Sequence, residues 1–185
     1  MAGKGNLIGP IPAGRNPEEY DHLRRRVFWK MPAGLYLIGS SVGERRNLMT
    51  ANWVTQVATE PKLLGVSVER TSLSHELIAT GRCFSVSILD REDRAVVRRF
   101  VKPTTDVREE MTLNGFSYFD APVSGAPVLA TAVAFLDCAL EREVAFTSHS
   151  LFVGEVVDAG FGREPDRGEQ REVLRVEDTR MNYGG

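Results

Sequence analysis

Two short polar segments, each beside a run of strand-forming residues, carry the side chains best suited to binding a ligand. The first runs from Asn47 to Asn52, and the second, from Arg70 to Ser74, follows the apolar run Leu63 to Val68. Backbone N–H groups, hydroxyls and a cation held at strand ends are typical of sites for anionic or heteroaromatic ligands. The sequence therefore predicts that these segments present polar groups to a ligand of that kind.

The second segment has the composition of a phosphate site. Arg70, Thr71, Ser72 and Ser74 supply one cation and three hydroxyls, directly before a short predicted helix that ends at Gly81. The first N–H groups of a helix have no partner within the helix, and they bind anions readily. A plain helix cap, made by Ser72 or Ser74, is the alternative interpretation.

His149 is the third candidate residue. It stands between Ser148 and Ser150, just before the apolar run that begins at Leu151, at a predicted boundary between a loop and a strand. Binding residues are common at such positions. A surface histidine that is hydrogen-bonded to its serine neighbours is an equally simple interpretation.

Short strands outnumber helices among the elements that would position these residues. Strands are expected at 35–40, 47–57, 63–68, 84–89, 130–143, 150–157 and 173–176. Helices are expected at 16–30, from 72–74 to 81, and at 90–100, with a turn-rich stretch at 104–127. Because no strand–helix–strand rhythm is present, the pattern favours a mainly β fold, an antiparallel barrel with peripheral helices.

Length and composition indicate one domain. The chain has 185 residues, 42% of them apolar, which is enough to bury a sizeable core without a disulfide or a metal. Residues 1–15 contain four Gly and two Pro and are expected to form a flexible N-terminal arm. Residues 16–185 are expected to form the domain.

Several classes of function are disfavoured by the composition. A net charge of -2 gives no basic field for nucleic acid. The longest apolar run, Val128 to Leu136, is too short to cross a bilayer, so neither nucleic acid nor a membrane is an expected partner and a cytoplasmic location is expected. Cys83 and Cys138 lack the spacing of a metal site, and we expect buried thiols and no metal.

Familiar catalytic motifs are also missing from the sequence. There is no G-x-G-x-x-G after a strand, no P-loop, no G-x-S-x-G and no H-E-x-x-H. Dinucleotide folds of the Rossmann type and the common hydrolase classes are therefore not indicated.

A series of blocks, in order, resembles one known family. The blocks are Met49 to Trp53, Leu63 to Val68, Thr71 to Ser74, Phe84 to Leu89 and Ser148 to Val156. Between about Phe28 and Asp158, their order and spacing resemble the flavin reductase family of FMN-binding split barrels. Two positions depart from the family's pattern, because Ser87 replaces an asparagine and Ser148 replaces an aspartate.

The resemblance implies a homodimer of six-stranded antiparallel Greek-key split barrels that bind FMN, or FAD in the same site. The isoalloxazine ring and ribityl chain would lie along Asn47, Leu48, Met49, Thr50, Ala51 and Asn52. The phosphate would lie at Arg70, Thr71, Ser72 and Ser74. Trp53, beside the first block, is expected either at the subunit junction or in the core.

The implied activity is reduction of the flavin by NADH or NADPH, with release of reduced flavin to a monooxygenase. His149 is the residue expected to take part in catalysis, at the mouth of the site, by positioning the nicotinamide and not as an essential acid or base. The alternative function is a tight flavin-binding electron carrier without NAD(P)H activity of its own, because split barrels support several chemistries.

Overall fold

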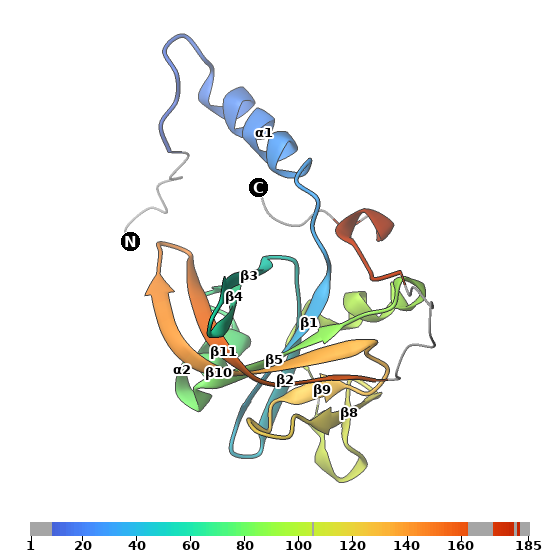
Figure 1. Cartoon of the computed structure of the whole chain (residues 1–185). Coiled ribbons are helices and arrows are strands. Elements are labelled where there is room, and N and C mark those ends of the chain that lie inside the picture. The colour runs from blue at the N-terminus through green and yellow to red at the C-terminus, as the bar shows by residue number, and fades with distance from the viewer. Residues whose placement is uncertain (1–8, 105, 163–171, 180, 182–185) are drawn as a thin grey trace, which may run out of the picture.

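The structure, a computed structural model, describes residues 9–104, 106–162, 172–179 and 181, and it shows a curled sheet with helices at its periphery (Figure 1). The helices among these residues are α1 (Pro17–Phe28), α2 (Leu73–Gly81), η1 (Arg91–Asp93), η2 (Val96–Phe100), η3 (Arg108–Glu110) and η4 (Val176–Asp178), where η marks a 3-10 helix. The strands are β1 (Tyr36–Val42), β2 (Arg45–Ala51), β3 (Val54–Thr59), β4 (Lys62–Glu69), β5 (Cys83–Ile88), β6 (Asp106–Val107), β7 (Thr112–Leu113), β8 (Phe116–Asp120), β9 (Pro127–Leu129), β10 (Ala134–Ala145) and β11 (His149–Phe161).

The larger sheet has the strand order β2-β1-β5-β10-β11-β4-β3, and every pairing in it is antiparallel. The predicted mainly β barrel with peripheral helices is confirmed, but this described sheet has seven strands instead of six. The difference arises because the expected strand 47–57 is interrupted at Asn52 and Trp53, which separate β2 from β3. These two strands are the edges of the sheet.

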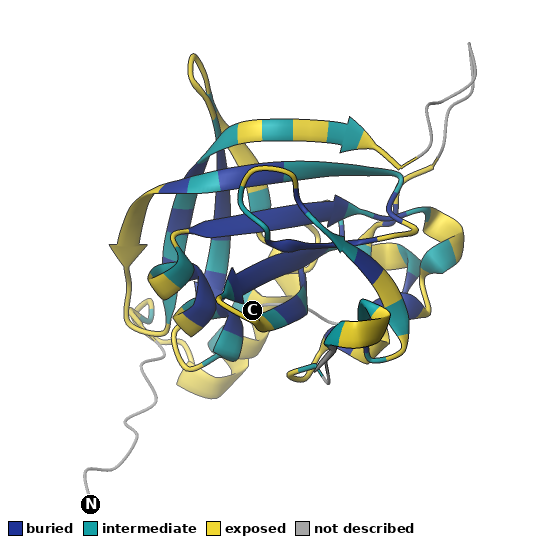
Figure 2. Cartoon of the chain, turned by 90° about the horizontal axis from the view of Figure 1, so that it is seen from below, coloured by how far each residue is buried: buried dark blue, intermediate teal, exposed yellow. Residues whose placement is uncertain are grey.

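Two apolar clusters fill the fold, and Figure 2 shows the buried residues concentrated in the central strands. One cluster gathers Ile38, Val66, Phe84 and Phe152. The other surrounds Phe100. Cys83 and Cys138 are buried free thiols, as predicted. Burial, with a smaller contribution from Asp137, raises the pKa of Cys138 to about 12.

A second sheet, β6-β7-β8-β9, occupies part of the stretch that was expected to be turns. Its strands are two to five residues long, too short to show the alternation by which a strand is recognised. Strand β9 packs against β5 through side-chain bonds. The Ser85 hydroxyl donates to the Pro127 carbonyl (2.6 Å), and the Ser87 hydroxyl accepts from the Leu129 N–H (3.1 Å).

An ion-pair network joins this second sheet to β2. Arg46 and Arg108 both bind the carboxylate of Asp120, at 3.0 Å and 2.8 Å. Burial alone would raise the pKa of Asp120, but the hydrogen bonds and charges of the two guanidinium groups outweigh burial and lower it. The carboxylate therefore stays charged and holds the two sheets together.

The helix boundaries follow local capping rules. The Asn16 side chain accepts from Glu18 N (3.0 Å) and Glu19 N (3.1 Å), and Ser72 caps α2. Helix α2 ends at Gly81, as predicted, and the left-handed residue that follows it is Arg82 (φ 57°). A Cβ on Gly81 would lie 2.1 Å from the Ser41 carbonyl oxygen, so glycine is needed there for close packing.

Two other predicted elements differ from the structure. The helix expected at 90–100 consists of the two 3-10 turns η1 and η2. The strand expected at 173–176 is reduced to the isolated bridges Asp90–Val173 and Gly34–Arg175, followed by η4. Of the expected N-terminal arm, residues 1–8 lie outside the described residues.

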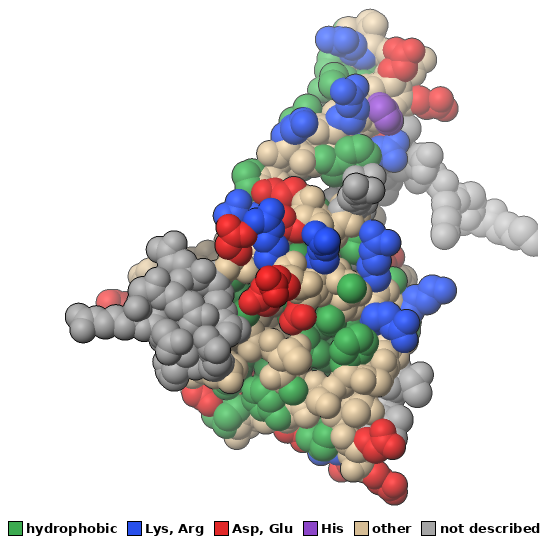
Figure 3. Space-filling view, turned by 90° about the vertical axis from the view of Figure 1, so that its right-hand side faces the viewer, with side chains coloured by type: hydrophobic (Ala, Val, Ile, Leu, Met, Phe, Trp, Pro, Cys, Tyr) green, Lys and Arg blue, Asp and Glu red, His purple; other side chains and the backbone are tan. Residues whose placement is uncertain are grey.

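Helix α1 projects from the body of the molecule, as Figures 1 and 3 show. None of its residues is buried, although Tyr20, Leu23, Val27 and Phe28 follow one another at helical spacing. Val27 and Phe28 are 62% and 59% exposed. Among the described residues, no helix combines the length and the apolar content needed to cross a bilayer.

Candidate functional site

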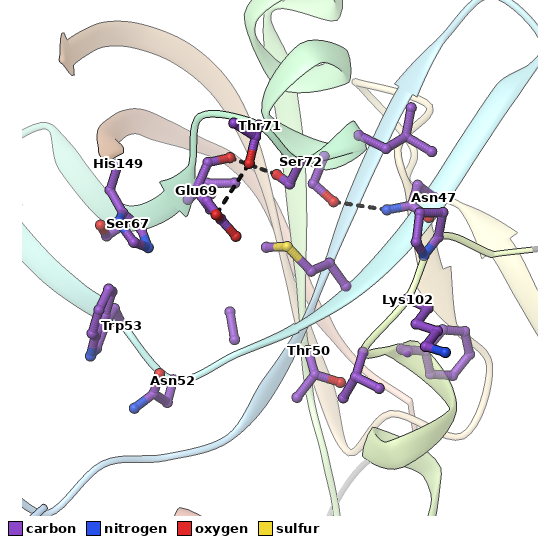
Figure 4. Close-up of a pocket in the computed structure, with 18 of the residues that line it drawn as sticks. Asn47, Thr50, Asn52, Trp53, Ser67, Glu69, Thr71, Ser72, Lys102 and His149 are labelled. Carbon is purple, nitrogen blue, oxygen red and sulfur yellow. Dashed lines mark hydrogen bonds between the residues drawn. The ribbon is translucent and has the colours of Figure 1, made fainter. Parts of the chain in front are cut away.

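A cavity of about 1020 Å³ lies where β2, the end of β4 and the start of α2 meet the chain that follows η2 (Figure 4). Its lining includes all the residues predicted for the site except Leu48 and Arg70. The predicted residues that the structure does bring together here are Asn47, Met49, Thr50, Ala51, Asn52, Thr71, Ser72, Ser74 and His149.

Strand β2 supplies one wall of the cavity, but its residue Leu48 does not contribute to it. Ala51 belongs to the cluster that contains Ile38 and Phe84, and Met49 packs against that cluster. Leu48, in contrast, is fully buried in the cluster around Phe100. Leu48 is therefore a core residue.

Arg70 was the cation expected at the phosphate, and its side chain lies elsewhere. Its guanidinium donates to the Phe146 carbonyl (3.3 Å), and its backbone N–H donates to the Ser148 carbonyl (3.0 Å). The Arg70 side chain thus contacts the hairpin between β10 and β11 and does not line the cavity. The turn after β4 directs the side chain to that hairpin, which spacing in the sequence could not reveal.

The corner between β4 and α2 carries the predicted hydroxyls. The Ser72 hydroxyl donates to the Glu69 carbonyl (2.8 Å) and accepts from His75 N (3.2 Å), so the helix-cap interpretation of Ser72 is confirmed. The Thr71 hydroxyl donates to the Glu69 carboxylate (3.1 Å). Figure 4 shows these three residues together on one side of the cavity.

Asn47 connects three parts of the wall. Its side-chain nitrogen donates to the Ser74 hydroxyl (2.8 Å), and its side-chain oxygen accepts from the N–H (3.1 Å) and hydroxyl (3.0 Å) of Thr104. Both Asn47 and Ser74 are buried. The amide therefore fixes β2 to the start of α2 and to the chain beyond η2.

The chain after η2 closes the far side of the cavity. Phe100, Val101, Lys102 and Pro103 line it, and the Thr50 hydroxyl donates to the carbonyl of Val97 in η2 (2.6 Å). In the sequence, Lys102 and Pro103 are marked only by their place just after the helix expected at 90–100. Their place in the cavity depends on contacts with β2, about 50 residues earlier in the chain, and no local signal marks them.

His149 lies at the predicted boundary, at the start of β11, and lines the cavity. Its ring is tilted by 59° against the ring of Trp53, with centroids 5.0 Å apart. Its Nδ1 forms a hydrogen bond with the Ser148 hydroxyl (2.9 Å), so the serine contact of the alternative interpretation is also present. Trp53 is 43% exposed, which excludes a plain core position in this structure.

Other lining residues were missed because nothing distinguishes them in the sequence. Ser67, Glu69 and Met181 also face the cavity. A second cavity of about 810 Å³ adjoins the first, and both contain Trp53 in their walls. Its lining is more aromatic and includes Phe28, Trp29 and Tyr36.

Comparison with known proteins agrees with this geometry. Residues 28–177 match the family model described as "Flavin reductase like domain". The chain is 33% identical over 156 residues to the NADH-dependent FAD reductase of Streptomyces globisporus, covering 83% of this chain and 82% of that protein.

Solved structures show the same fold. The NADH:FAD oxidoreductase of Streptomyces globisporus C-1027, in complex with NAD and FAD fragments, superimposes with a TM-score of 0.72 at 28% identity, covering 92% of this chain and 95% of that one. The flavin reductase component of a bacterial two-component tryptophan halogenase gives a TM-score of 0.69 at 26% identity, covering 83% and 97%. With the family model matching most of its length, this chain belongs to the flavin reductase family.

Proposed function

We propose that this chain is an NAD(P)H-dependent flavin oxidoreductase that binds FMN or FAD in the cavity beside β2. One observation carries the proposal: polar groups of β2, the hydroxyls before α2 and a lysine surround a single cavity that also has apolar walls. This donor set suits a flavin, which has a planar ring, a polyol chain and a phosphate. The names of the similar reductases support the same activity.

The residues of the cavity fit such a ligand. Met49 and Ala51 supply apolar surface for a ring system, and the backbone of the edge strand β2 offers N–H groups and carbonyls. A bound flavin would supply the redox chemistry, accepting a hydride from NADH or NADPH and passing its electrons on. We propose that His149 positions the nicotinamide, because it lies at the cavity wall against Trp53.

Binding and turnover test the proposal together. Added FMN or FAD is expected to lose fluorescence on binding, and added NADH or NADPH is expected to bleach its absorbance under anaerobic conditions. Ser67→Trp, which places a large ring in the cavity wall, should abolish both effects. Gln56→Trp, on the exposed part of β3, should preserve both and serves as the control. A wild-type protein that neither binds flavin nor oxidises NAD(P)H would contradict the proposal.

We also propose that the chain forms a homodimer. Support comes from apolar side chains that lie exposed at the end of α1 and on the edge strand β3. Val27, Phe28 and Met31 are 59–67% exposed, and Val57 is 46% exposed. A second copy would bury such surface. Light scattering at micromolar concentration should give twice the chain mass, and Val57→Asp should shift it toward the monomer. A monomeric mass for the flavin-loaded wild type would refute the dimer.

Delivery of reduced flavin to a monooxygenase is the last part of the proposal. It is supported by the similarity to the reductase component of a two-component halogenase. Mixed with NADH, flavin and a flavin-dependent monooxygenase that lacks its own reductase, this chain should support product formation. No product, despite NADH oxidation, would contradict this part of the proposal. Tight flavin binding without any NADH oxidation would instead favour the flavin-binding electron carrier.

A further inference from the structure

We infer that Lys102, and not Arg70, is the cation that binds the phosphate of the flavin. The inference rests on the proposed function and identifies one residue of that site. Sequence pattern alone assigns the phosphate to the stretch that begins at Arg70. The arrangement of charges in the cavity places the phosphate instead on the side of the cavity that carries Lys102.

Lys102 is the lysine that lines the cavity, in the segment between η2 and Thr104 (Figure 4). Its side chain is exposed, and within the described part of the chain it has no ion-pair or hydrogen-bond partner. Lysine ammonium groups bind phosphate as compact charges with three donors. The Arg70 guanidinium, in contrast, is committed to the Phe146 carbonyl and lies outside the cavity lining.

The backbone around Lys102 is held at both ends by side chains of β2. Before it, the Val97 carbonyl accepts from the Thr50 hydroxyl (2.6 Å), and the Phe100 side chain is fully buried. After it, Thr104 donates twice to the side-chain oxygen of Asn47. The lysine is thus carried by a fixed segment, so only its own side chain must be ordered when a phosphate binds.

Glu69 makes the predicted phosphate corner less suitable for a second negative charge. Its carboxylate lines the cavity and already accepts the hydroxyl of Thr71 (3.1 Å). The Ser72 hydroxyl is also occupied, by the Glu69 carbonyl and His75 N. Since like charges repel and a phosphate monoester is close to dianionic at neutral pH, the phosphate is favoured beside Lys102.

Comparing FMN with riboflavin isolates the phosphate, because the two ligands share the ring and the ribityl chain. The experiment measures the dissociation constant of each by fluorescence quenching at low ionic strength for wild type, Lys102→Met, Lys102→Arg and Arg70→Met. In Lys102→Met, we expect the constant for FMN to rise about tenfold, the size of one charge-assisted hydrogen bond, and that for riboflavin to change less than about twofold. Lys102→Arg should retain most of the preference for FMN, and Arg70→Met all of it.

The outcomes separate this inference from the proposed function. If Lys102→Met keeps the wild-type ratio of the two constants, or if Arg70→Met loses it, the assignment to Lys102 is wrong while flavin binding stands. If the wild type binds neither ligand, the proposed function fails and this inference with it. A preference for FMN in the wild type that weakens with added salt would support the charge interaction.

Discussion

Asn47→Ala is the substitution that tests how the walls of the cavity are joined. The side chain makes one hydrogen bond to Ser74 and two to Thr104, and so links β2 with α2 and with the segment that carries Lys102. Alanine removes all three bonds without adding bulk. The expected result is therefore a loss of stability together with weaker FMN binding.

The size of the loss follows from the burial of the partners. Ser74 is 1% exposed, so water cannot replace Asn47, and leaving its hydroxyl unpaired costs about 1–3 kcal/mol. Thr104 is only partly buried, so its two lost bonds cost about 0.5 kcal/mol each. We expect Asn47→Ala to lower the free energy of unfolding by about 3 kcal/mol.

Urea denaturation followed by circular dichroism measures this difference. Asn52→Ala is the matched control, because Asn52 lines the same cavity and has no hydrogen-bond partner in the described part of the chain. It should change the free energy of unfolding by less than about 0.5 kcal/mol. The double variant with Ser74→Ala should be more stable than the sum of the single losses predicts, because the unpaired hydroxyl is then gone. Equal unfolding curves for Asn47→Ala and Asn52→Ala would refute the reasoning.

Three further predictions concern packing, catalysis and pH. Gly39→Ala should lower the free energy of unfolding by about 3 kcal/mol, because the new Cβ would lie 1.9 Å from the Pro127 carbonyl oxygen. Gly65→Ala is the control, since the atom nearest its new Cβ is 3.1 Å away and belongs to a side chain. In the same urea experiment, it should lower the free energy of unfolding by less than about 1 kcal/mol. His149→Ala should raise the Michaelis constant for NADH or NADPH, or slow flavin reduction, at nearly unchanged flavin affinity, and unaltered stopped-flow rates would leave it an ordinary surface residue. Asp120 has a folded pKa below its unfolded value of about 3.9, so its stabilising contribution is complete above that value and is lost as pH falls through the folded pKa. Asp120→Asn should lower the melting temperature at pH 7, and its melting temperature should fall less steeply than that of the wild type below about pH 4. If the melting temperatures of wild type and variant fall in parallel with pH, the result would argue against the ion-pair network.

Sequence rules that depend on neighbouring residues correctly predicted the local features of the fold. The helix start at residue 16 and the cap at Ser72 could be predicted because a capping side chain bonds to an N–H two or three positions away. Nine of the eleven predicted site residues line the cavity, and those from Asn47 to Asn52 were predicted because they resemble one of the family's blocks. The two buried thiols followed from residue type alone.

What could not be predicted depends on contacts between distant parts of the chain. Whether Arg70 or Lys102 faces the cavity is decided by the Phe146 carbonyl on a distant hairpin and by the bonds from β2 to the segment beyond η2. Gly81 has the position of a terminal glycine in the sequence, but the approach of the Ser41 backbone explains why it is glycine. The strand expected at 173–176 has the right residue types and only isolated bridges in the structure, because residue type does not supply a pairing partner.

The break between β2 and β3 also has a consequence for how a ligand bound in the cavity would enter and leave. Because these consecutive strands are the two edges of the larger sheet, the cavity wall at Asn52 and Trp53 crosses a seam where neither strand hydrogen-bonds the other. A flavin could thus enter or leave without breaking a rung of the β-ladder. Exchange would then need only side-chain rearrangement at the seam, on the nanosecond scale of exposed side chains, and no opening of the barrel. A fold of this kind can release a reaction product quickly while its sheet remains rigid.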